Sequence, residues 1–489
     1  MRGDRKKEKE QQQQNNTGFV KFSKFCALLF FAVSLMFGAM LVLANILPPK
    51  YLLVAGLIEL LLFVIVFPPL YSRKTKNVQR TIALIMSGIL IIIYLFGVRY
   101  LASTMSFMSQ ITRIGATDEY YVVVRDDDMF NELTDIEGET VYAYQSSESH
   151  GDAIEELKSR VEIEVVSQND IGAMIEHLLS GEINVTFMSS GSYEAYNESS
   201  TSFDDYTKII DRFKIKHQVV DISKPVEVAK ESFNMYITGV DTEGTIDVTA
   251  RSDVNMVATV NPVTRTILLT SIPRDYYVMM PDVGAYDKLT HAGLKGANYT
   301  VATVEKLLGI DINYYIKVNF TTVVNLVDEI GGIDIESEYT FTTSDGNYYF
   351  VEGMNYDVDG AAALRFARER YAFSDGDFQR NKDQQIVLTA IINKISQSSV
   401  LLTNYTDILK SIENNIEMNM AEDELKSFIR MQTNDMSSWN VVSQNITGTT
   451  GSDYCYSFGQ FLSVVWQDQG SINAAVEKIR AVMAGETLE

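Results

Sequence analysis

The stretch VNMVATVNPVTRTILLTSIPRD, residues 254–275, decides the fold of the largest part of this chain. Two runs of β-branched and aliphatic residues flank the turn NPVT, which predicts a β-hairpin. If the turn centres near Pro262, Asp253 before the first strand and Arg274 after the second come to the same end of the hairpin. Arg251 lies two residues before Asp253, within reach of that end. The hairpin therefore predicts one carboxylate and two guanidinium groups at one edge of a sheet.

The segments around this hairpin predict an α/β domain. The buried-type strand FNMYITGVD, residues 233–241, precedes it and ends at Asp241, and strand ends of open α/β sheets are where ligands bind. Two helices follow: TVATVEKLL stops at Gly309, and FTTVVNLVDEI, capped by Asn319, stops at Gly331. NYYIKV and GIDIESE supply further strands.

A second charged stretch, RFARERYAFSDGDFQRNKDQQ at 365–385, gathers four arginines and a lysine among four carboxylates. Arg368 and Arg370 are two apart, so in an extended segment they point to one face. From about Phe378 the pattern predicts an amphipathic helix on which Arg380 and Gln384 share a face, with Asp377 at its N-cap. The amino end of a helix suits a phosphate. A solvated, salt-bridged surface is the alternative for such a charge run.

These side chains together favour a phosphoryl site. Guanidinium forks bind phosphate oxygens bidentately and keep their charge, so an arginine cluster suits a pyrophosphate. Asp241 and Asp253 beside the arginines make sense as ligands of Mg²⁺, which takes carboxylate, water and phosphate oxygens. Metal and arginines would together stabilise charge on a transferring phosphoryl group.

Three apolar runs in the first hundred residues predict a membrane anchor. They begin at Lys24, Tyr51 and Thr81, and each approaches the ~20 residues that a helix needs to cross a bilayer. The amino end and the second loop, SRKTKNVQR, are basic, whereas the first loop holds one lysine. By the positive-inside rule, the N-terminus is cytoplasmic and everything after the third span is extracellular, in a multi-pass plasma-membrane protein.

Charge and cysteines narrow the functional classes. Residues 1–101 hold 13 basic and 4 acidic side chains, a net charge of +9, and the remainder holds 28 and 60, a net charge of −32. Such an acidic external part argues against nucleic acid as a partner, because phosphate-backbone binding needs a broad positive field. Cys26 and Cys455 are too far apart in the predicted topology to pair. The histidines show no metal-binding spacing, and only His291 lies in a stretch where it could touch substrate.

Residues 119–215, between the anchor and the hairpin domain, alternate strand and helix signals. YYVVV, ETVYAY, VEIEVV and INVTFM read as strands, and GDAIEELKSR and DIGAMIEHLLSG as helices. This alternation predicts a small α/β domain of unassigned role, joined to the next domain by the linker DISKPVEVAKES.

At this point the chain resembles a known family. GVDTEGTIDVTARSDVNMVATVNPVTRTILLTSIPRDYYV, DKLTHAG and ALRFARERYAFSDGDFQRNKDQQ, in this order, closely resemble the LytR–CpsA–Psr family of Gram-positive bacteria. The resemblance runs from about 232 to 395 and continues more weakly to SINAAVEKIRAVMAG. The three spans and the extra α/β domain look like the capsule-associated, CpsA-like branch.

The resemblance implies an organisation and an activity. It implies a cytoplasmic tail at 1–23, three transmembrane helices at 24–101, an extracellular accessory α/β domain with linkers at 102–231, a catalytic core at 232–400 and its C-terminal part at 401–489. The core would be a central twisted mixed sheet between helices. Family members move a glycopolymer, such as a teichoic acid or capsule polysaccharide, from a polyprenyl-pyrophosphate carrier to a peptidoglycan sugar hydroxyl. Capsule-assembly proteins are further candidate partners.

The resemblance also implies roles for single residues. The pyrophosphate would be held by Arg274, Arg368, Arg370 and Arg380, assisted by Gln384, with Lys288 and Lys306 as less specific candidates. Asp241 and Asp253 would serve Mg²⁺, Arg251 would order Asp253, and Asp377 would orient the arginines or a magnesium-bound water. One departure is Asp383, since many members read RNQRQQ where this chain reads RNKDQQ; the substitution lowers the local positive charge.

Three further points stay open at this stage. Val323, Leu326, Val327 and the Ile386–Ile395 face could line a groove for the lipid tail, with ordinary core packing as the alternative. A phosphohydrolase that cleaves the same carrier is an alternative activity. An envelope sensor or transcriptional attenuator is another class, which the absence of a DNA-binding signature in the short cytoplasmic segments disfavours.

Overall fold

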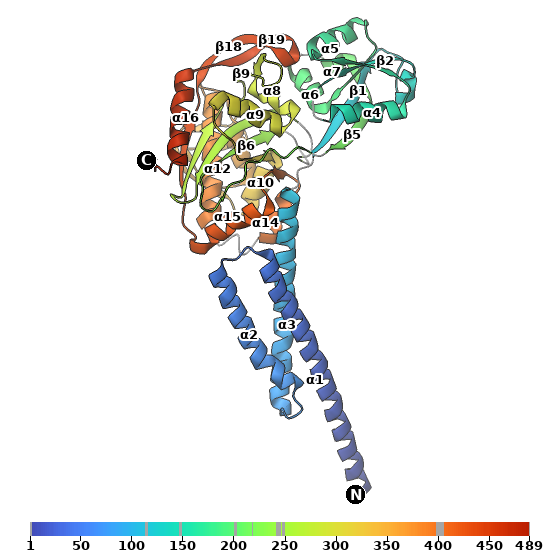
Figure 1. Ribbon diagram of the computed structural model, residues 1–489, viewed down its shortest axis with the longest axis vertical. Coiled ribbons are helices and arrows are strands. Elements are labelled where there is room, and N and C mark those ends of the chain that lie inside the picture. Colours follow the sequence, from blue (N-terminus) through green and yellow to red (C-terminus); the bar gives the residue numbers. More distant parts are fainter. Residues whose placement is uncertain are drawn as a thin grey trace. The chain divides into compact units, whose positions relative to one another are not determined.

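The computed structural model describes residues 2–112, 116–145, 149–199, 203–217, 219–240, 246, 250–397 and 405–488. Its contacts divide the chain into two compact units. Unit 1 comprises residues 1–109 and 425–436, and unit 2 comprises residues 110–424 and 437–489. Figure 1 shows the elements of both. The two units are described separately below.

Unit 1 consists mainly of the helices α1 (Arg2–Ala44), α2 (Pro49–Tyr71) and α3 (Asn77–Ile111). Each contains a span long and apolar enough to cross a membrane, the first of them at Thr17–Ala44, which confirms the predicted apolar helices. Their shared core includes Phe30, Leu70 and Tyr94. The unit also holds most of α15 (Glu422–Asp435), whose Arg430 Nη1 donates to Asn45 Oδ1 at 2.5 Å.

The small domain of unit 2 is a sheet in the order β3-β2-β4-β1-β5. The strands are β1 (Ala116–Arg125), β2 (Thr140–Tyr144), β3 (Glu164–Gln168), β4 (Val185–Ser189) and β5 (Thr207–His217), with the 3-10 helix η1 (Leu133–Ile136). The helices are α4 (His150–Arg160), α5 (Ile171–Ser180), α6 (Ser190–Ser199) and α7 (Phe203–Tyr206). The predicted helices and first four strands are present, whereas the long strand β5, antiparallel to β1, was not predicted.

The large domain of unit 2 is built on a mixed sheet in the order β16-β11-β6-β7-β8-β17. The strands are β6 (Phe233–Val240), β7 (Ser252–Asn261), β8 (Thr266–Ser271), β11 (Tyr314–Asn319), β16 (Ile416–Met418) and β17 (Asn440–Asn445). β7 and β8 form the predicted antiparallel hairpin, with Met256 opposite Ser271. β11 is parallel to β6 and β17 is parallel to β8.

One face of this sheet packs on a core that contains Val257, Leu268 and Ile479. The elements on this side are α8 (Leu289–Ala292), η2 (Gly293–Lys295), α9 (Ala297–Leu308), α16 (Gln469–Met483), β9 (Tyr277–Met279) and β10 (Tyr286–Lys288). The hairpin of β18 (Gly448–Cys455) and β19 (Gln460–Gln467) joins the segment just before β9 through a bridge between Tyr276 and Val465. η3 (Tyr456–Phe458) connects the two hairpin strands, and its Phe458 packs into the core of the small domain.

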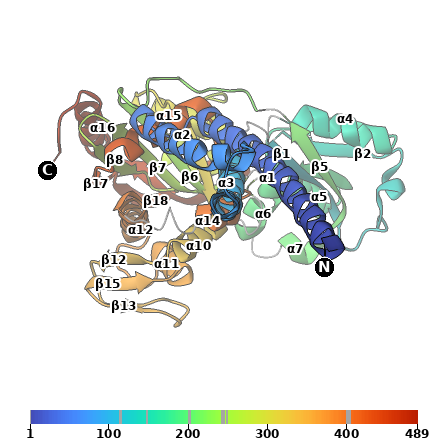
Figure 2. The same ribbon diagram turned by 90° about the horizontal axis from the view of Figure 1, so that it is seen from below.

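The opposite side carries the second helical layer, seen beside the strands in Figure 2. Its helices are α10 (Phe320–Glu329), α11 (Gly360–Arg368), α12 (Asp377–Gln397) and α14 (Tyr405–Ile412). Four short strands adjoin them: β12 (Ile333–Ser337), β13 (Phe341–Thr342), β14 (Tyr349–Phe350) and β15 (Gly353–Val358). Both helix stops and the Asn319 cap are as predicted: Asn319 Oδ1 accepts the Thr322 N–H at 2.9 Å.

The extended segment predicted at Arg368 and Arg370 is wrong. Arg368 is the last residue of α11, and Arg370 lies in the turn that follows. The reason is local: Asp359 caps the helix by accepting the Ala362 N–H at 2.8 Å, and the apolar stripe of Ala363 and Phe366 buries against the core. The two arginines reach the same pocket because the chain turns sharply between them.

Gly360 sets how closely α11 approaches α10. A Cβ at this position would lie 2.2 Å from the carbonyl oxygen of Val324, which is backbone and cannot swing away. We therefore expect Gly360→Ala to lower the free energy of unfolding by about 1–3 kcal/mol through overpacking. Thermal unfolding of the full-length protein in detergent measures the change. Ala361→Ser on the exposed side of the same helix is the control, and equal melting temperatures for the two variants would contradict this account.

Candidate functional site

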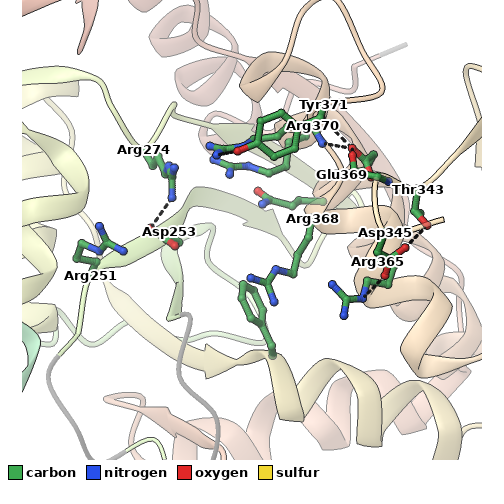
Figure 3. Close-up of a pocket in the computed structure, with 14 residues that line it drawn as sticks. Arg251, Asp253, Arg274, Thr343, Asp345, Arg365, Arg368, Glu369, Arg370 and Tyr371 are labelled. Atoms are coloured by element: carbon green, nitrogen blue, oxygen red, sulfur yellow. Dashed lines mark hydrogen bonds and ion pairs between the residues drawn. The ribbon is translucent and has the colours of Figure 1, made fainter. Parts of the chain in front are cut away.

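A polar pocket of about 370 Å³ lies where the β7–β8 hairpin, α10, α11 and the start of α12 meet. Figure 3 shows Arg251, Asp253 and Arg274 on one side, Arg365, Asp345, Thr343 and Glu369 on the other, and Arg368 and Arg370 between them. The lining is completed by Phe320, Ser344, Tyr371, Arg380 and Gln384. Three segments that are far apart in the sequence therefore contribute arginines to one cavity.

The hairpin end forms the first wall, as the sequence predicts. Arg274 Nη1 lies 3.2 Å from Asp253 Oδ1, and the Thr290 hydroxyl donates to the same oxygen at 3.2 Å. Thr290 comes from the short helix α8. Its backbone N–H donates to the carbonyl of Arg274 at 2.8 Å, which ties α8 to the segment that follows β8. Asp253 is thus held on one oxygen by two partners, and Oδ2 remains for a ligand in the pocket.

Asp377 at the start of α12 joins three of the arginines. Its carboxylate lies 3.4 Å from Arg380 Nη2, 3.8 Å from Arg370 Nη1 and 3.8 Å from Arg274 Nε. Like charges this close repel, so the shared carboxylate is what allows the three guanidinium groups to converge. The predicted role of Asp377 as the residue that orients the arginines fits this geometry.

Buried guanidinium donors in this cluster lack hydrogen-bond partners. Arg274 Nε and Arg380 Nε and Nη2 are fully buried, and the structure gives them no hydrogen bond. Arg380 is only 8% exposed. Burial lowers the pKa of Arg380, and the neighbouring Arg274 and Arg370 lower it further against the opposing effect of Asp377 and Asp253. Unpaired buried donors carry a desolvation cost that an anion with several oxygens would remove.

The remaining arginines are positioned by aromatic rings. The Arg368 guanidinium lies 4.5 Å from the centre of the Phe320 ring, and that of Arg370 lies 4.4 Å from the centre of the Tyr371 ring. Between them, Glu369 is buried and accepts from backbone N–H groups of Ser344 at 2.6 Å and Ala372 at 3.0 Å. Although burial alone would raise the pKa of Glu369, these hydrogen bonds lower it overall, so the carboxylate pins the turn that carries both arginines.

Sequence reasoning missed part of the pocket. Phe320, Thr343, Ser344, Asp345 and Tyr371 were not predicted, because their positions depend on how the β13–β14 hairpin and α10 fold back on α11. Arg365 was noted only as part of the charged stretch; its Nε lies 3.2 Å from Asp345 Oδ2 at the rim. Arg365 could have been predicted from its spacing: it lies three residues before Arg368, and in a helix residues three apart share a face.

Two predicted lysine contacts are not supported. Lys288 Nζ pairs with Asp275 Oδ1 at 3.2 Å, and Lys306 is exposed in the last turn of α9; neither lines the pocket. His291 is also elsewhere: its Nδ1 lies 2.5 Å from Asp287 Oδ1, and its ring packs on Phe458. Asp241 lies outside the described residues.

An apolar groove with a cavity of about 100 Å³ adjoins the polar pocket and shares Phe320 and Gln384 with it. Its lining comprises Ile237, Gly239, Val254, Met256, Val318, Asn319, Val323, Leu364, Ala367, Val387, Leu388 and Ile391. Val323 and part of the Ile386–Ile395 face are therefore placed as hypothesised. Leu326 and Val327 pack in the core behind the groove instead.

The model of the LytR_cpsA_psr family matches residues 192–470, more than half of the chain. The chain belongs to the LytR_cpsA_psr family.

Curated relatives of this LytR_cpsA_psr protein carry informative names. It is 34% identical over 252 residues, 50% of this chain and 79% of the relative, to the "Polyisoprenyl-teichoic acid--peptidoglycan teichoic acid transferase TagU" of Bacillus mycoides. A protein of the same name from Enterococcus faecalis is 36% identical over 45% of this chain and 73% of its own length. A crystal structure of B. subtilis TagU aligns with a TM-score of 0.41 at 28% identity, over 53% of this chain and 100% of that one.

The residues present suit a magnesium ion in one respect. Asp253 lines the pocket, and Mg²⁺ commonly takes one or two carboxylates together with phosphate oxygens and water. A second acidic group with metal-ligand spacing, Asp287 with His291 and Cys455, is buried away from the pocket. Its Asp287 is already satisfied by His291, by the Ser457 N–H at 2.6 Å and by the Lys288 N–H at 2.7 Å.

The departure at Asp383 does not reach the pocket of this LytR_cpsA_psr protein. Asp383 is 1% exposed, accepts from Gln379 Nε2 at 3.0 Å and does not line the cavity. Burial raises the pKa of Asp383 to about 8, despite the hydrogen bond from Gln379. The side chain is therefore largely protonated at neutral pH, and the expected loss of positive charge at the site is wrong.

The raised pKa makes stability depend on pH. In the unfolded chain Asp383 ionises near pH 4, whereas in the folded protein it holds its proton to about pH 8, so folding loses stability as pH rises between these values. We expect Asp383→Asn to be more stable than the wild type, with an advantage that grows by up to about 1.4 kcal/mol per pH unit from pH 5 to 8. Thermal melts of both proteins across this range test the slope; a constant difference would contradict it. Asp375→Asn, exposed in the same segment, is the control.

Proposed function

We propose that this protein is a membrane-anchored phosphotransferase that moves a glycopolymer from a polyprenyl-pyrophosphate carrier to a hydroxyl group of peptidoglycan. The observation that carries the proposal is the set of buried N–H donors of Arg274 and Arg380 that make no hydrogen bond, in a pocket that adjoins an apolar groove. A diphosphate joined to a hydrocarbon tail has matching chemistry at both ends. The names of the curated relatives support the same reaction class.

The diphosphate would occupy the space between the two walls. Arg274 and Arg380 donate to it from the hairpin and α12, while Arg368 and Arg370 approach from the α11 side. These four arginines carry four positive charges, and Asp253 and Asp377 offset two of them. The net positive charge that remains suits an anion with two or more negative charges. The same groups lie where negative charge grows during phosphoryl transfer, so they would stabilise the transition state without reorganising.

The transfer forms one P–O bond and breaks another. The oxygen of the acceptor hydroxyl attacks the phosphorus that bears the polymer and forms a new P–O bond. The bond from that phosphorus to the bridging oxygen breaks, and its electron pair leaves with the polyprenyl monophosphate. The hydroxyl proton passes to water, since a loose phosphoryl transition state needs little help from a base. Mg²⁺ bound at Asp253 and the diphosphate would neutralise charge on the leaving group.

The anchor fits a substrate that is itself fixed in a bilayer. Three apolar helices precede the α/β domains, and the basic residues flank the amino end and the second loop. We infer from the positive-inside rule that the N-terminus is cytoplasmic and that both α/β domains are extracellular. Polymer transfer to peptidoglycan takes place on that side. The polymer can be a teichoic acid or a capsule polysaccharide, and capsule-assembly proteins stay candidate partners.

Loss of a single arginine tests the assignment. We expect Arg274→Ala and Arg368→Ala each to lower the rate of polymer transfer by about 10²–10³-fold, the scale of losing one preorganised charge donor at a developing anion. Arg480→Ala on the exposed side of α16 is the matched control. Release of polyprenyl monophosphate from a synthetic donor, with peptidoglycan present, gives the rate. Undiminished transfer by both variants would remove the pocket from the mechanism.

The same assay separates transferase from phosphohydrolase. In ¹⁸O-water, hydrolysis places one labelled oxygen on a phosphate product, whereas transfer to a sugar hydroxyl introduces none. We expect unlabelled monophosphate and polymer bound to peptidoglycan. Label in the products even with excess acceptor would favour the hydrolase. A sensor would show neither product, and its signalling output would survive Arg274→Ala.

The groove is tested through the length of the lipid. Leu388 lines the groove from α12 and is partly exposed, so a larger ring can be placed there. Because each buried CH₂ contributes about 0.8 kcal/mol, we expect Leu388→Trp to raise the KM of a long-chain donor by about tenfold or more and to leave a donor of two isoprene units unaffected. Leu388→Met is the control for volume. An equal effect on both donors would place the tail elsewhere.

A further inference from the structure

A strip of aromatic and polar side chains lies on the face of the β18–β19 hairpin next to β9. It consists of Trp466, Asp453, Tyr277 and Tyr286, and is called the aromatic strip below. Trp466 and Tyr286 are 40% and 42% exposed. Exposed aromatic groups that gather in one place mark binding surfaces more often than scattered ones do.

The strip is held in a fixed arrangement. Trp466 Nε1 donates to Asp453 Oδ2 at 3.0 Å, and the Tyr277 hydroxyl donates to the Tyr454 carbonyl at 2.7 Å. The rings of Tyr277 and Tyr286 stack with centres 5.1 Å apart. The indole ring lies over Gly451: a Cβ at this residue would lie 2.2–2.7 Å from atoms of the six-membered ring. One face of the indole therefore rests on the strand, and the exposure of the side chain comes from the other.

A short stretch of chain joins the strip to the arginine pocket. Tyr277 follows Arg274 by three residues, and the intervening turn is closed by a hydrogen bond from Tyr276 N–H to Pro273 carbonyl at 3.0 Å. The hairpin is fastened there, since Val465 N–H donates to Asp275 carbonyl at 2.8 Å and Gln467 Nε2 to Tyr277 carbonyl at 2.8 Å. Backbone reach limits the separation of Arg274 and Tyr277 to about 10 Å.

The chemistry of the strip suits a neutral sugar chain. A pyranose ring has an apolar face of C–H groups that packs on an aromatic ring, and hydroxyls at its edge that a carboxylate or amide can accept or donate to. Asp453 supplies such a group beside Trp466 and Tyr277. Asp453 disfavours an anionic lipid surface and a phosphate-bearing polymer, because like charges repel in this partly exposed setting.

The direction from which the hydroxyl attacks the phosphorus indicates where the acceptor binds relative to the lipid-linked donor. The leaving lipid phosphate belongs with the apolar groove, which lies on the side of the sheet covered by α10, α11 and α12. The strip continues β9 and β19, whose residues Val278 and Val465 pack on the other side. Because attacking and leaving oxygens lie roughly in line in phosphoryl transfer, the acceptor approaches from the side opposite the lipid.

We propose that the aromatic strip binds the glycan strand of the peptidoglycan acceptor and guides its hydroxyl toward the pocket. This inference rests on the proposed function for the identity of the sugar, and the strip itself adds a binding site outside the arginine pocket.

Tryptophan fluorescence can report the binding directly, since the chain has two tryptophans. Trp439 is 8% exposed beneath Arg265, so Trp439→Phe leaves Trp466 as the reporter. The experiment titrates full-length protein in detergent with soluble peptidoglycan oligosaccharides. We expect a saturable change in emission, and a five- to tenfold weaker affinity, roughly, when Tyr286→Ala is added, the scale of losing one aromatic contact. Phe461→Ala, exposed on the opposite face of the same hairpin, is the matched control and should leave affinity unchanged.

Kinetics then link the strip to catalysis. Trp466→Ala and Tyr286→Ala should raise the KM for the acceptor by a similar factor without changing kcat or the KM for the donor. Arg274→Ala should lower transfer by about 10²–10³-fold, as stated above, yet keep glycan binding, so failure of the proposed reaction and failure of the strip are distinguishable. Glycan binding that both strip variants leave intact, absence of any binding by an active protein, or binding of the donor polymer alone would each overturn the proposal.

Discussion

Convergence of like charges is the constraint on which the site depends. Two guanidinium groups about 6 Å apart repel by about 3 kcal/mol at an effective dielectric constant of 20. This protein brings Arg274, Arg370 and Arg380 to one carboxylate, Asp377, and adds Asp253 beside the first of them. The carboxylates reduce the repulsion without cancelling it. What is left is a pocket in which donors of Arg274 and Arg380 still lack hydrogen bonds, which an entering anion can supply.

The two faces of the large sheet differ in role: one packs on the hydrophobic core and the other lines the apolar groove. Side chains of β6 and β7 that point to one face, such as Tyr236 and Val257, bury against α9 and α16, whereas Ile237 and Met256 on the other face line the apolar groove. The period of two along a strand makes this division possible from a single pair of strands. The polar pocket forms at the end of these strands, between the β7–β8 hairpin and the helices α10, α11 and α12. The lipid tail and the diphosphate of the proposed donor, and the proposed acceptor, can therefore each reach the site from a different direction.

Short polar contacts around the pocket keep the arginines in place. Glu369 gathers backbone N–H groups from two segments and fixes the turn between Arg368 and Arg370. Thr290 from α8 shares Asp253 with Arg274, and its neighbour His291 is locked by Asp287 and Phe458. Phe458 belongs to η3, which also packs into the core of the small domain. The small domain is thus joined by packing to the helix that supports Asp253.

The sequence by itself determined the three apolar helices, the α/β alternation, the hairpin that pairs Asp253 with Arg274, and the family. These follow from local patterns: hydrophobic runs, the period of two in strands, and caps and stops at Asn319, Gly309 and Gly331. Only the tertiary structure decided that Arg368 ends a helix, that Lys288 and Lys306 lie away from the pocket, and that Asp383 is buried outside it. Each of these depends on which face of an element meets which neighbour, and that is set by packing between segments far apart in the chain. Phe320, Thr343 and Tyr371 line the pocket for the same reason. Their segments reach it through tertiary packing, which no spacing in the sequence indicates.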